Sequence, residues 1–236
     1  MKTIVIATRN AHKVEEIRAI LGGFQLLTLN EFPAAPRVIE DGTTFAENAA
    51  KKALELARWF YVKFPPSPRA SPLFVLADDS GLEVDMLDGA PGVHSARFAA
   101  LDAAQSGNTP DADNNAKLLR LLQGLPLEKR RARFHCVLAL VPVPEPKTSS
   151  SSPVCYADEF EVRTFDGACE GRIGFEPRGK NGFGYDPLFV PVGLEQTFAE
   201  LSDAEKNKLS HRARALEQLN AYFVAHPPGH VEPPRL

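Results

Sequence analysis

Two adjacent carboxylates, Asp78 and Asp79, follow an apolar run at Leu73–Ala77 and precede Ser80 and Gly81. A short apolar run that ends in turn residues is typical of a buried strand. Ligands gather at the carboxyl ends of strands in open α/β sheets. Adjacent carboxylates repel one another unless a cation or a proton-transfer role offsets the cost. The stretch therefore predicts either an acid–base or metal site at a strand end, or a plain turn closed by Ser80 and Gly81.

A second polar segment, Thr8–Lys13, lies between an apolar strand at Met1–Ala7 and a helical pattern. This order of elements directs backbone N–H groups and the positive end of a helix dipole toward an anion. Asn10 can cap the helix, and a phosphate would stabilise Lys13 in a first turn where the dipole disfavours a cation. The glycines of a P-loop are absent, so a phosphate site and a plain capped helix start both remain open.

Further candidate residues lie on two predicted helices. Thr44 and Glu47 form a capping box at the start of the first, which explains Glu47 and leaves Glu40 as the better metal-ligating carboxylate. Lys52, near the start of that helix, either binds an anion or lies on a solvated face. A second capping box, Ser202–Glu205, predicts one helix running to about Ala225, and three donors lie near its start: Lys206, His211 and Arg212.

The glycine-rich stretch Gly171–Pro187 ends in Gly182–Pro187, which alternates glycines with Phe183 and Tyr185. Glycines allow a backbone to approach a ligand closely, and an aromatic face can stack on a base. The alternative is a turn whose aromatic rings pack beneath it.

Composition excludes several classes of protein. The 236 residues are 44% hydrophobic and 24% charged with a net charge of −3, which is ordinary for a soluble domain and offers no basic surface for nucleic acid. No apolar run has the length of a membrane span or signal peptide, and three cysteines without metal-site spacing favour reduced thiols in the cytoplasm. We expect one domain at 1–225, irregular segments at Phe64–Pro72 and Glu145–Pro153, a strand at Val154–Phe165, and a proline-rich tail at 226–236.

Five stretches, in this order along the chain, resemble the inosine/xanthosine triphosphate pyrophosphatase family. They are TRNAHK (Thr8–Lys13), DGTTFAENA (Asp41–Ala49), ADDSGLEVD with GAPGVHSARF (Ala77–Phe98), GFGYDPLF (Gly182–Phe189) and ELSDAEKNKLSHR (Glu200–Arg212). The resemblance implies an α/β fold: a long mixed central sheet flanked by helices, in two lobes with a cleft between them. It implies hydrolysis of ITP, dITP and XTP to the monophosphate and pyrophosphate, a need for Mg²⁺, and a homodimer.

The resemblance also assigns roles by motif position. Asp79 would be the general base, and Glu40 with Asp79 the metal site. Thr8, Asn10, Lys13 and Lys52 would hold the triphosphate, with Ser80 beside it. The remaining substrate-binding positions are Arg9, Ala11 and His12 in the first turn, and Phe183, Gly184, Tyr185, Asp186, Lys206, His211 and Arg212 around the base. Arg9 and His12 depart from the small residues usual in the family, which leaves the shape of that turn open.

Three other functions compete with this one. A pyrophosphatase for modified pyrimidine nucleotides conflicts with GFGYDP and SHR, the motifs that the resemblance places beside the base. A nucleotide sensor without catalysis would not need Asp79, Glu40 and Lys13. A nucleic-acid-binding module conflicts with the net charge.

Overall fold

The computed structural model describes residues 2–64, 72–102, 107–144 and 160–226. Its centre is one six-stranded sheet in the order β2-β1-β3-β4-β5-β6. The strands are β1 (Thr3–Ile6), β2 (Gln25–Thr28), β3 (Leu73–Val84), β4 (Arg131–Pro142), β5 (Arg163–Ile173) and β6 (Phe189–Pro191). The helices are α1 (Ala11–Ile20), α2 (Phe45–Lys63), α3 (Asp111–Leu121), α4 (Asp203–Leu209) and α5 (His211–Ala225). β1 is parallel to β2 and β3, whereas β3, β4, β5 and β6 are successively antiparallel. The predicted long mixed sheet is confirmed.

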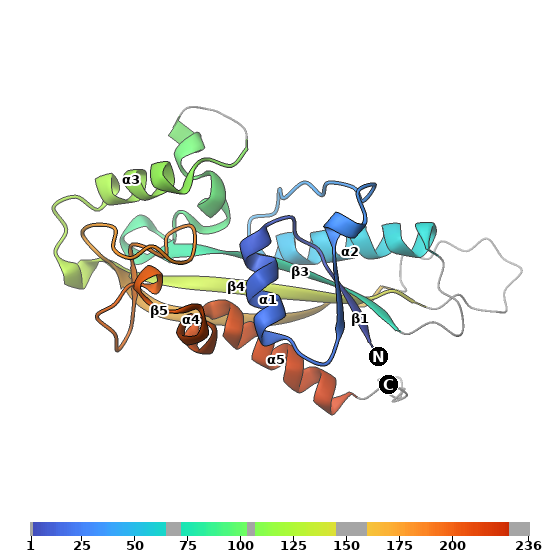
Figure 1. The fold of residues 1–236 in the computed structure, drawn as a ribbon. Coiled ribbons are helices and arrows are strands. Elements are labelled where there is room, and N and C mark those ends of the chain that lie inside the picture. Colours follow the sequence, from blue (N-terminus) through green and yellow to red (C-terminus); the bar gives the residue numbers. More distant parts are fainter. Residues whose placement is uncertain (1, 65–71, 103–106, 145–159, 227–236) are drawn as a thin grey trace, which may run out of the picture.

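Helices cover both faces of the sheet (Figure 1). α2 packs on one face through a cluster that includes Phe45, Leu56, Val75 and Val137. α1 and α5 pack on the other, where Ile17 and Leu216 meet the strands. A third cluster, containing Leu82, Phe134, Tyr185 and Phe198, lies beside α3 at the C-terminal end of β3. α1, α2 and α5 therefore each bury an apolar stripe against the sheet, and the long strands connect the two ends of the molecule.

β3 corrects the expectation of a strand that ends in a turn at Asp78. The strand continues through Asp79, Ser80 and Gly81 to Val84 because β4 pairs with it in register from Phe74 to Val84. On its other side, β1 pairs only as far as Leu76. The two carboxylates therefore lie within a strand, at the point where its parallel neighbour ends.

The C-terminal region corrects the expectation of one helix after Ser202. Two helices form, because Ser210 is extended at φ −68° and ψ 158° and its side chain accepts a hydrogen bond from the Ala213 N–H group. A serine N-cap satisfies one free donor of the following helix, so Ser210 ends α4 and begins α5. The break places His211 and Arg212 in the first turn of a new helix.

Other predicted elements agree with the structure. The capping box of Thr44 and Glu47 begins α2, and Asn10 caps α1 by accepting from the Lys13 N–H group. The β4–β5 pair is antiparallel as expected, although β5 begins at Arg163, and 154–159 lies outside the described residues. Most of the predicted irregular segments also lie outside the description, at 65–71 and 145–153, as does the tail after His226.

Candidate active site

A cleft of about 660 Å³ opens where β1 stops and leaves one edge of β3 unpaired. This volume is typical of a site for a small organic ligand. Its walls come from the β1–α1 turn, the loop before α2, β3, the 3₁₀ helix Gly92–Arg97, the 183–186 loop and the α4–α5 junction. All these segments carry sequence-predicted site residues except the 3₁₀ helix.

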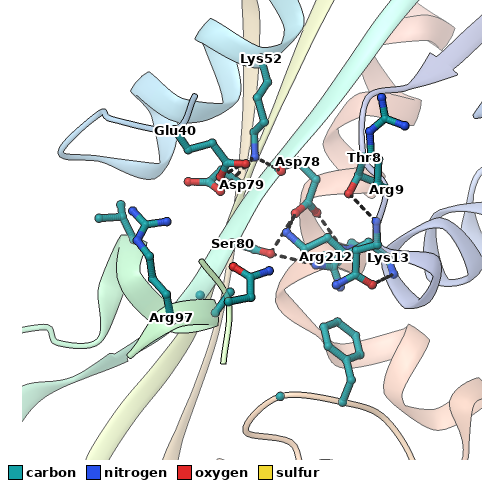
Figure 2. Close-up of a pocket in the computed structure, with 18 of the residues that line it drawn as sticks. Thr8, Arg9, Lys13, Glu40, Lys52, Asp78, Asp79, Ser80, Arg97 and Arg212 are labelled. Atoms are coloured by element: carbon teal, nitrogen blue, oxygen red, sulfur yellow. Dashed lines mark hydrogen bonds and ion pairs between the residues drawn. The ribbon is translucent and has the colours of Figure 1, made fainter. Parts of the chain in front are cut away.

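Asp78 is a fully buried carboxylate that joins three elements on the α5 face of the sheet. Its Oδ2 accepts from Arg212 Nε at 2.8 Å and from the Cys136 thiol at 3.3 Å, and its Oδ1 accepts from Ser80 Oγ at 2.9 Å and from Lys13 Nζ. Burial alone would raise the pKa of Asp78, but Arg212 and Lys13 lower it well below its usual range. Asp78 therefore stays ionised and holds two cations at the cleft (Figure 2).

Asp79 lies on the opposite face of the sheet, beside α2. Lys52 Nζ donates to Asp79 Oδ1 at 3.1 Å and to the Asp78 carbonyl at 2.8 Å, and it lies 3.2 Å from Glu40 Oε2. Burial raises the pKa of Asp79, against the effect of Lys52. Asp79 Oδ2 is buried and has no hydrogen-bond partner among the described residues. An unpaired buried carboxylate oxygen is costly, so this atom is the one prepared to meet a ligand or a proton.

A second buried charge network supports the wall of the cleft that α4, α5 and the 183–186 loop form. Lys206 Nζ donates to Asp186 Oδ2 at 2.6 Å and to Glu16 Oε1 at 2.7 Å, and Glu16 also pairs with Arg212. Burial would lower the pKa of Lys206, but Asp186 and Glu16 raise it, so the amine remains charged. Asp186 also accepts from the Phe183 N–H group at 2.8 Å. The network thus fixes α1, α4, α5 and the 183–186 loop relative to one another.

His211 lies under the cleft with its ring stacked on Phe134, at 4.8 Å between centroids. Burial, with Arg212 and Lys206 nearby, lowers its pKa well below the usual range, so the imidazole is neutral. Its Nδ1 is buried and has no hydrogen-bond partner within the described part of the chain. His211 can therefore give a ligand one neutral donor or acceptor but no charge.

The 183–186 loop presents one aromatic ring and withdraws the other. Gly182 and Gly184 have φ values of +71° and +62°, which favour glycine, and they flank Phe183 at the cleft wall. The Phe183 ring stacks on His12 at 5.2 Å, with Lys206 Nζ 5.0 Å from its centroid. Tyr185 is buried and donates from its hydroxyl to the Ser95 carbonyl at 2.9 Å. Of the two rings, only Phe183 is placed to stack on a base.

The structure brings most of the predicted site residues to one cleft. Thr8, Arg9, Asn10, Lys13, Glu40, Lys52, Asp79, Ser80, Phe183, Gly184, Tyr185, Asp186, Lys206, His211 and Arg212 line it. Ala11 and His12 lie on α1 and do not line the cleft. Asp186, Lys206 and Arg212 are almost wholly buried, so they form the wall behind the cleft more than its surface.

Sequence reasoning missed Asp78 as the organising carboxylate and missed Glu16 altogether. The sequence signal for Asp78 was present, because in a strand successive side chains alternate between faces and one of two adjacent acids must lie on each side. Glu16 offered no such signal, because its partners lie 190 and 196 residues further along the chain.

The donor set near Asp79 is compatible with a hard divalent cation. Among the described residues, no group of three or more His, Cys, Asp or Glu side chains is arranged to hold a metal ion. Mg²⁺ in nucleotide sites commonly takes only one or two carboxylates and completes its shell with phosphates and water. The partly exposed Glu40 carboxylate suits that role, with the Asp79 carboxylate beside it across Lys52.

Comparisons with known proteins give one consistent family. The Ham1 family matches residues 4–222. The dITP/XTP pyrophosphatase of Exiguobacterium sibiricum is 46% identical over 220 residues, which cover 92% of this chain and 95% of that protein. The dITP/XTP pyrophosphatase of Geobacillus kaustophilus is 46% identical over 222 residues, 93% of each chain.

Solved structures agree. The Staphylococcus aureus Ham1 protein superposes with a TM-score of 0.73 at 34% identity, covering 95% of this chain and 99% of that one. A Coxiella burnetii HAM1 protein gives 0.71 at 37% identity, covering 95% and 100%.

Proposed function

Because the chain belongs to the Ham1 family, we propose that it hydrolyses the non-standard purine nucleoside triphosphates ITP, dITP and XTP to the monophosphate and pyrophosphate. The enzyme would act on the anhydride bond between the α and β phosphates and so remove these nucleotides from the pool. The observation that carries the proposal is Asp79, which lines the cleft beside Lys52 and whose buried Oδ2 has no hydrogen-bond partner among the described residues.

The proposed chemistry begins with proton transfer to Asp79. Water that attacks phosphorus must lose a proton, and a carboxylate whose pKa is raised by burial is a stronger base than an exposed one. Lys52 fixes Asp79 through Oδ1, which leaves Oδ2 to take the proton. Substituting either residue would remove a different part of this arrangement.

The triphosphate would lie across the exposed edge of β3. Lys13 and the first turn of α1 approach it from one face of the sheet and Lys52 from the other, since β1 no longer covers this edge. Mg²⁺, held by Glu40 and Asp79 together with phosphate oxygens, would supply charge neutralisation when bound. Thr8, Asn10 and Ser80 would add hydrogen bonds to the phosphates.

Base selection would come from the opposite wall. Phe183 would stack on the purine, and the remaining N–H groups of Lys206 and Arg212 would favour a 6-oxo acceptor over the amino group of adenine. These donors are fixed by Asp186, Glu16 and Asp78, so a base that leaves them unpaired is penalised.

We also propose a cytoplasmic homodimer. Within the described part of the chain no helix combines the length and apolarity that crossing a membrane requires. Cys136 and Cys169 are free, buried thiols, as expected in a reducing compartment, and Cys155 lies outside the described residues. Sedimentation of the purified protein tests the dimer directly.

The experiment that tests the function is pyrophosphate release from ITP, XTP, dITP, GTP, ATP and dUTP, with Mg²⁺ and with EDTA. The proposal predicts fast Mg²⁺-dependent release from the first three and little from GTP or ATP. Fastest release from dUTP would favour the pyrimidine alternative, and binding of ITP without release would favour the sensor.

A further inference from the structure

The predicted phosphate ligands do not supply the net positive charge that would attract a polyphosphate to the cleft. Seven cationic and five acidic side chains line it, and Glu16 pairs with two of the cations from behind. Lys13, Lys206 and Arg212 share three carboxylates: the buried Asp78 and Asp186 and the partly buried Glu16. These three cations therefore bring no net charge to an incoming polyphosphate.

Lys52 does not supply the missing charge, because it lies between Asp79 and Glu40. The lining cations without a carboxylate partner among the described residues are Arg9, Arg37 and Arg97. Without these three arginines the ionised side chains at the cleft, with Glu16, would sum to a formal charge of −2; with them the sum is +1. Before any Mg²⁺ binds, a nucleoside triphosphate would be repelled in the first case and attracted in the second.

Arg97 is the best placed of the three. Arg9 donates to the Ala35 carbonyl at 3.1 Å, and Arg37 belongs to an exposed part of the loop before α2. Arg97 is half-buried and lies on the same side of β3 as Glu40, Asp79 and Lys52 (Figure 2).

The segment that carries Arg97 is firmly attached to β3. Ser95 Oγ accepts from the Leu82 N–H group at 2.9 Å and donates to the Gly92 carbonyl at 2.6 Å. Gly81 permits this close contact, because a Cβ at that position would overlap Ser95 and Gly92. Tyr185 ties the same segment to the 183–186 loop through the Ser95 carbonyl. A ligand-binding arginine on such a platform loses little conformational freedom on binding.

We propose that Arg97 is a substrate-binding residue that contacts the pyrophosphate portion of the triphosphate. The inference rests on the proposed function and adds a phosphate ligand that the motif comparison did not assign. A guanidinium without an acidic partner can form a bidentate, charge-assisted pair with phosphate oxygens, which an amine cannot.

The test compares wild type, Arg97→Gln, Arg97→Lys and the control Arg131→Gln, which removes an exposed arginine outside the cleft. The dissociation constants of pyrophosphate and of IMP, with Mg²⁺, are measured by calorimetry, and KM and kcat for ITP by pyrophosphate release. Arg97→Gln is expected to weaken pyrophosphate binding and raise KM by about 10-fold or more, the effect of losing a charged hydrogen bond. Arg97→Lys should recover part of the loss, while Arg131→Gln and all IMP affinities should stay near wild type.

Unchanged pyrophosphate affinity in Arg97→Gln would overturn the inference, as would an equal loss in Arg131→Gln. Because calorimetry needs no turnover, these outcomes are separate from the failure of the proposed function, which would appear as a wild-type protein that hydrolyses none of the triphosphates.

Discussion

Asp78 and Asp79 are neighbours in β3, yet their carboxylates lie on opposite faces of the sheet. Asp78 meets Lys13 and Arg212 on the α5 face, and Asp79 meets Lys52 on the α2 face. The alternation of side chains along a strand produces this separation. Because β1 ends before this point, a ligand that lies across the edge of β3 can reach both groups, and the two carboxylates can serve different purposes.

The variant Asp79→Asn tests the proposed role of Asp79 as the general base. The amide retains the size of the side chain but cannot accept the proton, so kcat for ITP should fall by about 10²–10⁴-fold, the usual range for a lost general base. Substrate affinity, measured by calorimetry with ITP, should fall far less, because Lys13 and the α1 turn remain. Normal turnover by this variant would exclude Asp79 as the base.

The variant Asp78→Asn tests whether the charge of Asp78 holds Lys13 and Arg212 in place. Removing one partner of a buried ion pair leaves the others uncompensated, so the free energy of unfolding should fall by about 3–5 kcal/mol in urea titrations. Ser80→Ala, which removes a hydroxyl that donates to Asp78 and accepts from Arg212 but leaves all the charges in place, should cost less, about 1–2 kcal/mol. Equal losses in the two variants would show that the charge of Asp78 does not organise the site.

Lowering the pH should weaken the ion pairs of Asp78 with Lys13 and Arg212 in the wild type. The folded-state pKa of Asp78 is depressed, so its stabilisation is fully present above the unfolded pKa of about 3.9 and is lost as the pH falls through the lower folded value. The difference in unfolding free energy between wild type and Asp78→Asn should therefore be constant near neutrality and narrow below about pH 4. Urea titrations across that range measure it, and a difference that does not change with pH would contradict the assignment.

The sequence predicted which residues lie together at the candidate site better than it predicted the strands and helices that carry them. Asp79 and Phe183 belong to motifs that can be identified locally, and Lys52 follows one of these motifs closely on the same predicted helix. The continuation of β3 could not be, because Asp78–Gly81 has the composition of a turn and only pairing with the distant β4 keeps it extended. The break between α4 and α5 depends on one serine inside an otherwise helical pattern.

The break at Ser210 yields a prediction of its own. Ser210→Ala removes the N-cap of α5 and should cost about 1 kcal/mol of stability. It should also raise KM for ITP, since His211 and Arg212 follow the cap directly. Ser202→Ala is the matched control, because it removes the N-cap of α4 at an exposed position. Its KM should stay near wild type, and a similar rise in both variants would assign the effect to general destabilisation.

Phe183 is the residue that we propose to stack on the base, and Phe175 in the same chain serves as its control. Phe175, 62% exposed, lies in the same glycine-rich stretch and contacts Arg130 outside the cleft. Phe183→Ala should weaken IMP binding by the free energy of one base–aromatic stack, about 1–3 kcal/mol, and leave pyrophosphate binding unchanged. Phe175→Ala should change neither affinity. Calorimetry with the two products separates the outcomes: if Phe183→Ala weakens pyrophosphate binding as much as IMP binding, its ring supports the cleft as a whole, and the base must be held by other groups.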